Sequence, residues 1–296
     1  MKRDPRRARL DTHPGSGQFT AHSRAPTRSD GRIFVLPDTA TSWKLAGLPT
    51  AEEVAFYREN GYLKFGRLFT EEEMADLSRY LDKLLEELPP GKRPESLDVP
   101  HFEHPYLFRF LLHPRVLDAI EALVGPHITL WSSHFISKPR GDGLAVPWHT
   151  DGDYWGARLE PMEVATMWLA VDPSNQSNGC MRVVPGSHQW GGGLKYKPVD
   201  KTTNVFDEEI EEGTFDESQV VDLEIEKGEC HFHDAYTVHG SLPNHSDRRR
   251  CGYTMRYMPA HVVFHPLGPH DQHRVYLARG RDLTGGKTIY SETPRW

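Results

Sequence analysis

The segment 146–155 contains a histidine and an aspartate, His149 and Asp151, separated by a single residue. On an extended chain, residues two positions apart point to the same side, so this imidazole and carboxylate can hold adjacent positions on one metal ion. The pattern alone has low specificity, because a chain with 17 histidines produces such pairs by chance. A second pair, His245 and Asp247, is present, and either pair taken alone is ordinarily a surface turn.

A third ligand is available farther along the chain, at His239. Two histidines and one carboxylate on one face of a metal ion suit Fe(II) and leave three positions open for a chelating cosubstrate and O2. Arg250 follows His239 by eleven residues, beyond a Pro-Asn turn, so the chain can bring it back to the same cavity. Because a guanidinium binds a carboxylate through two parallel hydrogen bonds, we expect a dicarboxylate cosubstrate, 2-oxoglutarate.

Two alternatives remain open for these residues. His231 and His233 lie on one face of a predicted strand and could form a metal site with His239 in the manner of cupins. Arg248 and Arg249 directly precede Arg250, and a solvated run of charge is the ordinary interpretation for two of these three arginines.

Composition excludes several classes of protein. The chain of 296 residues carries 35 basic and 42 acidic side chains, a formal charge of −7, which gives no general means of holding nucleic acid by its phosphates. Its apolar runs are too short to cross a bilayer. Three cysteines without a Cys-x-x-Cys motif argue against a disulfide framework or a zinc ribbon, so we expect a reducing, cytoplasmic location.

The N-terminal segment differs from the remainder of the chain. Residues 1–32 hold eight basic and three acidic side chains with few large apolar residues. We therefore expect residues 1–45 to be disordered or loosely attached. A single domain is expected over 46–296, with a helical flank at 50–125 and a β core at about 127–265.

Helices are expected first along the chain and short strands afterwards. Capping boxes at Thr50 and Thr70 predict helices ending near Gly61 and Pro89, and a third helix is expected over 114–124. Apolar runs bounded by turn residues predict strands over 128–137, 164–171, 180–184, 230–233, 238–241 and 253–258. This order favours a mainly β fold with flanking helices, a sandwich or barrel. The acidic stretch 207–217 is expected to be a solvated loop.

Five motifs in this order resemble the phytanoyl-CoA dioxygenase family of Fe(II)/2-oxoglutarate-dependent oxygenases. The motifs are Phe135-Ile-Ser-Lys-Pro139, Trp148-His-Thr-Asp151, Met167-Trp-Leu-Ala-Val171, Asn178-Gly-Cys-Met-Arg-Val-Val-Pro-Gly-Ser-His188 and His239-Gly-Ser-Leu-Pro-Asn244. The resemblance covers about 130–260 directly, and it implies a double-stranded β-helix, a cupin-like jelly roll whose mouth holds the iron.

Residue by residue, the resemblance implies a ligand set and a cosubstrate site. The iron ligands would be His149, Asp151 and His239. The residues expected at 2-oxoglutarate are Arg250 on the distal carboxylate, Ser241 with a further hydrogen bond, His134 and Trp168. Tyr154, Trp155 and His233 are candidates for contact with the substrate, although core packing explains the aromatic pair equally well.

The expected reaction is hydroxylation of an unactivated C–H bond of a small molecule, with release of succinate and CO2. Ascorbate is a candidate stimulant, and the protein is expected to be a monomer or homodimer. In halogenating relatives a small residue replaces the carboxylate ligand, so the resemblance implies that a chain with Asp151 at this position does not halogenate. Desaturation, epimerisation and cyclisation use the same oxidant and remain open. So do a catalytically silent jelly-roll protein that retains its metal, and a cupin-type isomerase or hydrolase. The loop 191–220 is expected to cover the pocket.

Overall fold

The computed structural model describes residues 43–296, which belong to one compact unit. The expectation of a loose N-terminal tail falls on residues 1–42, outside the described part. Trp43, the first described residue, already contacts the domain, three residues before the expected boundary. The Trp43 indole Nε1 donates a hydrogen bond to the Phe69 carbonyl at 2.9 Å, and the Arg67 guanidinium lies 4.7 Å from the Trp43 ring centroid.

The helical flank forms where the capping signals predict it. Thr50 and Thr70 each accept a hydrogen bond from the backbone N–H three residues on, and the glutamate there accepts one in return. The helices are α1 (Ala51–Asn60), α2 (Glu71–Glu86), α3 (Phe108–Leu111), α4 (Pro114–Val124) and the short α5 (Asp151–Trp155).

Antiparallel sheets make up the rest of the fold, and two of them form a jelly roll. The major sheet has the strand order β1-β11-β6-β13-β3-β15, with β2 paired to β3, and the minor sheet has the order β10-β7-β12-β4. Two small pairs, β14-β5 and β8-β9, complete the set. The strands of the major sheet are β1 (Tyr62–Phe65), β2 (Leu97–Asp98), β3 (Ile128–Lys138), β6 (Ala165–Ala170), β11 (Cys230–Asp234), β13 (Arg250–Pro259) and β15 (Tyr276–Arg279). Those of the minor sheet are β4 (Val146–His149), β7 (Met181–Val183), β10 (Val221–Leu223) and β12 (His239–Ser241), and those of the small pairs are β5 (Leu159–Glu160), β8 (Tyr196–Pro198), β9 (Glu208–Ile210) and β14 (Val263–Phe264).

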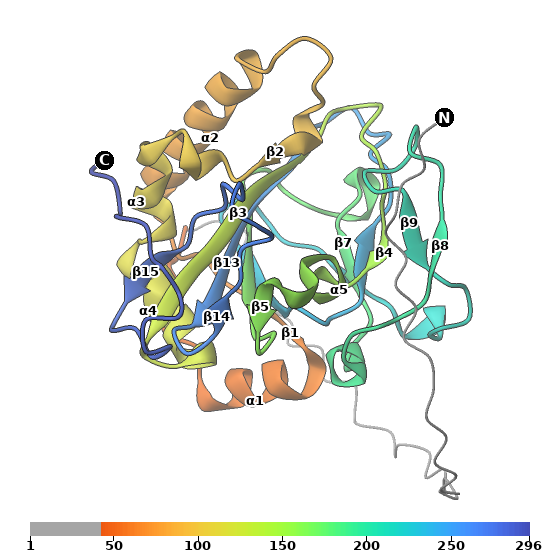
Figure 1. Ribbon diagram of the computed structural model, residues 1–296. Coiled ribbons are helices and arrows are strands. Elements are labelled where there is room, and N and C mark those ends of the chain that lie inside the picture. The colour runs from red at the N-terminus through yellow and green to blue at the C-terminus, as the bar shows by residue number, and fades with distance from the viewer. Residues whose placement is uncertain (1–42) are drawn as a thin grey trace, which may run out of the picture. The chain divides into compact units, whose positions relative to one another are not determined.

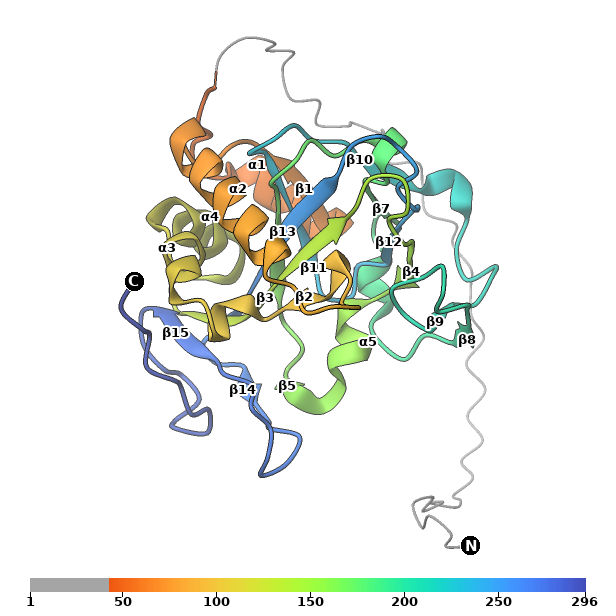
Figure 2. The ribbon, with the colours of Figure 1, turned by 90° about the horizontal axis from the view of Figure 1, so that it is seen from above.

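The two faces of the major sheet have different partners. Helices α1 to α4 lie on one side of it and the minor sheet lies on the other (Figures 1 and 2). Because side chains alternate along a strand, Cys230 and Phe232 of β11 pack in the core on the helical side, whereas His231 and His233 face the minor sheet. The interior between the sheets therefore receives the two histidines of β11.

The acidic stretch 207–217 is not wholly a solvated loop, as its composition suggested. Glu208–Ile210 forms β9, which pairs with β8 in the register Tyr196 to Ile210. The reason is apolar burial: Ile210 lies in a cluster with Val184 and Val238, and Phe215 packs against the same cluster.

Two expectations from composition can be compared with the described residues. Cys180, Cys230 and Cys251 are all buried and unpaired, in agreement with the expected lack of a disulfide framework. Within residues 43–296, no helix is both long enough and apolar enough to span a bilayer.

Candidate active site

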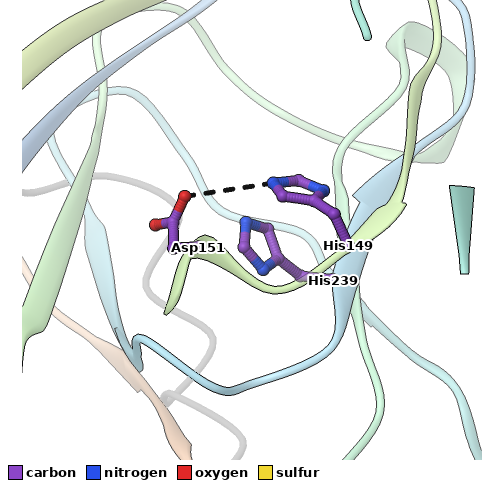
Figure 3. A group of neighbouring side chains, drawn as sticks. All are labelled: His149, Asp151 and His239. Carbon is purple, nitrogen blue, oxygen red and sulfur yellow. Dashed lines mark ion pairs between the residues drawn. The ribbon is translucent and has the colours of Figure 1, made fainter. Parts of the chain in front are cut away.

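The three expected ligands lie together where the minor sheet meets α5 (Figure 3). His149 ends β4 and His239 begins β12, and the two residues are cross-strand partners. Asp151 is the first residue of α5, so it does not continue the extended segment that its spacing suggested; Thr150 caps this helix instead. One ligand atom from each of the three side chains lies within 4.8 Å of the other two.

Hydrogen bonds orient both imidazoles for metal binding. The Nδ1–H of His149 donates to the Pro147 carbonyl at 2.8 Å, and that of His239 donates to the Thr237 carbonyl at 2.9 Å. Each bond leaves the Nε2 lone pair free for a metal ion, as in most histidine metal sites. Burial lowers the pKa of both rings, so they are neutral, as ligands must be.

Asp151 is held ionised inside the protein. It is only 6% exposed, and burial by itself would raise its pKa. The Arg256 guanidinium, with Nε 3.6 Å from Oδ2, and the imidazole of His233 at 3.8 Å outweigh burial and lower the pKa. Asp151 Oδ2 accepts no hydrogen bond from the described residues. Two neutral imidazoles and one buried carboxylate with a free oxygen fit a divalent ion such as Fe(II).

A cavity of about 590 Å³, partly open to solvent, extends from these ligands between the two sheets. Five other expected site residues line this cavity. Four of them come from the major sheet, and Ser241 comes from the minor sheet. They are Arg250, Ser241, His134, Trp168 and His233.

Arg250 is 2% exposed, with its guanidinium held at the end of β13. Its Nε and Nη2 donate to the Gly179 carbonyl at 3.0 and 2.7 Å, and Nη2 also lies 3.3 Å from the Ser241 hydroxyl. Burial lowers its pKa to about 10, so it remains a cation at neutral pH. Arg249, by contrast, pairs with Asp172 outside the cavity, which separates the roles of the adjacent arginines.

His134 and Trp168 both line the cavity. The Nε2–H of His134 donates to the Glu95 carbonyl at 2.9 Å, and its Nδ1 lies 3.7 Å from the Asp98 carboxylate, so both ring nitrogens have partners within the protein. The Arg250 guanidinium lies 5.5 Å from the Trp168 ring centroid.

The two aromatic candidates from α5 have different surroundings. Tyr154 is 39% exposed, and its ring lies 5.6 Å from that of His149 and 4.9 Å from that of Phe206. Trp155 packs edge-on against Trp131, and neither Tyr154 nor Trp155 lines the cavity. Of the two, Tyr154 is the one placed beside the metal ligands.

The cavity residues that sequence reasoning did not find include two charged side chains and one aromatic, Arg256, Glu95 and Phe206. Arg256 carried a usable signal, because it follows Arg250 by six positions on one strand and therefore faces the same side. Glu95 lies in a short 3-10 turn far from any motif, and its burial depends on Arg93, whose Nε and Nη2 donate to its carboxylate at 3.1 and 3.0 Å. Phe206 lies in the expected covering loop, but nothing local distinguished it from its neighbours.

Comparison with known proteins agrees with this geometry. The family model for phytanoyl-CoA dioxygenase (PhyH) matches residues 57–252, about two thirds of the chain, including the three expected metal ligands and Arg250. The chain belongs to the phytanoyl-CoA dioxygenase family. It is thus an enzyme of the Fe/2-oxoglutarate oxygenase type, and its two-sheet core is the jelly roll of that family.

The proteins to which this chain is similar differ in the reactions that their names state. Ectoine dioxygenase of Bordetella parapertussis is 24% identical over 260 residues, covering 78% of this chain and 83% of the relative. The non-heme monooxygenase ThoJ is 26% identical, with a TM-score of 0.66 and coverage of 81% and 88%. The alpha ketoglutarate-dependent carbocyclase SnoK from nogalamycin biosynthesis is 25% identical, with a TM-score of 0.60 and coverage of 82% and 94%.

Proposed function

We propose that this protein is an Fe(II)- and 2-oxoglutarate-dependent dioxygenase that hydroxylates an unactivated C–H bond of a small molecule. The observation that carries the proposal is the convergence of His149, Asp151 and His239 in the same cavity as the buried Arg250. The names of ectoine dioxygenase and the monooxygenase ThoJ support oxygen insertion into a small substrate.

Bound iron supplies the means to couple oxidative decarboxylation of 2-oxoglutarate by O2 to oxidation of the substrate. The protein's own part is binding and exclusion of water. His149 and His239 present neutral nitrogens, and Asp151 presents an ionised carboxylate. Arg250 and Ser241 present donors for the distal carboxylate of the cosubstrate.

The wall beside His149 is apolar and suits the substrate. Phe206 packs edge-on against the His149 ring at 4.9 Å. Its loop is fixed to the metal-binding segment, because the Val205 N–H donates to the Ala145 carbonyl at 2.9 Å and the Ala145 N–H donates to the Thr203 carbonyl at 3.0 Å. This loop lies within 191–220, the segment expected to cover the pocket, and it supports a role in selecting the substrate.

Cyclisation is the second candidate, favoured by the similarity to the carbocyclase SnoK. The mass of the product separates the two reactions. Hydroxylation adds one oxygen atom, whereas oxidative ring closure and desaturation both remove two hydrogens, and epimerisation leaves the mass unchanged.

The test is succinate formation by protein supplied with Fe(II), 2-oxoglutarate, O2 and a panel of small molecules, with and without ascorbate. We expect succinate from the native protein and none from His239→Ala. The matched control is His245→Ala in the exposed second His-x-Asp pair, which should behave as the native protein does. A native protein that binds metal but forms no succinate with any compound would instead be a silent binding protein. Conversion of a compound without 2-oxoglutarate would indicate a cupin-type enzyme.

A further inference from the structure

Three side chains from neighbouring strands form a stack beside the expected cosubstrate site. The rings of Trp168 and His231 are nearly parallel, with an interplanar angle of 10° and a centroid separation of 5.2 Å. The Arg250 guanidinium lies 5.5 Å from the Trp168 ring centroid. Because β6 lies between β11 and β13 in the sheet, His231 and Arg250 approach Trp168 from the two strands that flank it.

The backbone of β13 also packs against the Trp168 indole. A Cβ atom at Gly252 would lie 2.0 Å from two carbons of the Trp168 ring, so the ring rests directly on this glycine. Trp168 is thus confined by the Gly252 backbone and by the His231 ring. The Arg250 guanidinium lies over the face of the Trp168 ring, where the electron density of the ring attracts a cation.

Besides Trp168, His231 contacts the ring of His233, at a centroid separation of 5.7 Å. It is 0% exposed, neither ring nitrogen has a hydrogen-bond partner, and it is not part of the group of metal-binding side chains. Burial lowers its pKa, so the ring is neutral and adds no positive charge beside Arg250. Burying an imidazole without partners is unfavourable. What the ring contributes is its flat shape.

We propose that His231 is a positioning residue that holds Trp168 in place under the Arg250 guanidinium, and thereby sets the affinity for 2-oxoglutarate. The inference rests on the proposed function. It also replaces the alternative role of His231 as a metal ligand with a role in the stack.

The experiment compares His231→Ala with His231→Phe in full-length protein loaded with Fe(II) under anaerobic conditions. The dissociation constant for 2-oxoglutarate is measured by calorimetry, and that for Fe(II) is measured separately. His231→Ala should weaken 2-oxoglutarate binding by about threefold to tenfold, the range of a lost stacking contact, and leave Fe(II) binding unchanged. His231→Phe keeps a flat ring and should restore the native affinity.

Two further variants separate positioning from general damage. Phe232→Leu truncates the neighbouring residue of β11 on the helical face, so it should lower stability without changing 2-oxoglutarate affinity. Gly252→Ala displaces Trp168 from the side opposite to His231 and should weaken 2-oxoglutarate binding as His231→Ala does. If His231→Ala does not fold, Gly252→Ala takes its place in the comparison.

The outcomes that would overturn the inference are distinct. Native affinity in both His231→Ala and Gly252→Ala would show that the stack does not position Arg250. Equal losses in His231→Phe and His231→Ala would show that the ring nitrogens matter and not the ring shape. Absence of 2-oxoglutarate binding by the native holoprotein would overturn the proposed function, and this inference with it.

Discussion

The guanidinium of Arg256 lies 3.6 Å from the carboxylate of Asp151, and both side chains are buried. A carboxylate in a protein interior stays ionised only if a positive charge or hydrogen bonds compensate its lost hydration. Arg256 provides that charge before a metal arrives, which explains how the site can exist preformed in the metal-free protein.

Arg256→Gln should destabilise the metal-free protein by about 3–5 kcal/mol, because it leaves Asp151 buried without a fixed cation. A bound metal restores a positive charge, so the rise in melting temperature on metal addition should be larger in Arg256→Gln than in the native protein. Arg248→Gln is the matched control: its pair with Asp247 is exposed and should be worth less than about 1 kcal/mol. A smaller metal-induced rise in Arg256→Gln would refute the role given to this ion pair.

Stability of the metal-free protein should depend on pH through its buried histidines. Burial lowers the pKa of His149 and His239, and that of His101 to about 3. These folded-state pKa values lie below the unfolded value of about 6.5, so at acidic pH the unfolded chain binds more protons than the folded one. The contribution of these histidines to the free energy of unfolding is therefore complete above pH 6.5 and is lost as the pH falls below it. Chemical denaturation between pH 8 and 5 should show falling stability, with a shallower slope in His101→Phe. A free energy of unfolding that does not change between pH 8 and 5 would contradict the conclusion that these histidines are buried in the neutral form.

Phe206→Ala tests the apolar wall beside His149. With any substrate that the native enzyme oxidises, kcat/KM should fall by about tenfold, the usual effect of removing a hydrophobic contact. Affinity for metal should change little, because the hydrogen bond from His149 Nδ1–H to the Pro147 carbonyl still orients that ring. Affinity for 2-oxoglutarate should not change, because Arg250 and Ser241 are held by the strands β13 and β12 and not by the loop that carries Phe206. Trp190→Ala removes another aromatic that is largely exposed and should have no such effect. An unchanged kcat/KM in Phe206→Ala would place the substrate elsewhere.

Arg250→Lys keeps the positive charge but removes the planar pair of donors. We expect the dissociation constant for 2-oxoglutarate to rise by about tenfold or more, measured by calorimetry, with metal affinity unchanged. Arg249→Lys is the neighbouring control, since Arg249 pairs with Asp172 and Asp82 outside the cavity. If Arg249→Lys weakened cosubstrate binding and Arg250→Lys did not, the two assignments would have to be exchanged.

Local signals predicted α1, α2 and α4 and the long strands well, but not the short helices α3 and α5. The capping boxes at Thr50 and Thr70 begin α1 and α2, and the apolar periodicity that follows sets the buried face of α2. The apolar run at 253–258 predicted the strand β13, which begins three residues earlier, at Arg250. These features could be read from the sequence because short-range contacts determine them.

Features that depend on tertiary contacts could not be predicted in the same way. The residue type of Asp151 indicated a ligand, but the start of α5 at this position depends on the Thr150 cap and on Gly152, whose N–H donates to the Ala235 carbonyl at 2.8 Å. β9 depends on burial of Ile210 against distant strands. The stack of His231 on Trp168 depends on the pairing of β11 with β6.

The most direct test of the central claim is an anaerobic titration of 2-oxoglutarate into the Fe(II)-loaded protein, followed by the visible charge-transfer absorbance of the chelate. We predict that the native protein develops the band with one 2-oxoglutarate bound per iron, and that His149→Ala and His239→Ala do not. A native protein that takes up Fe(II) without developing the band, or a His239→Ala variant with the full band, would contradict the claim that these residues hold an iron centre for 2-oxoglutarate.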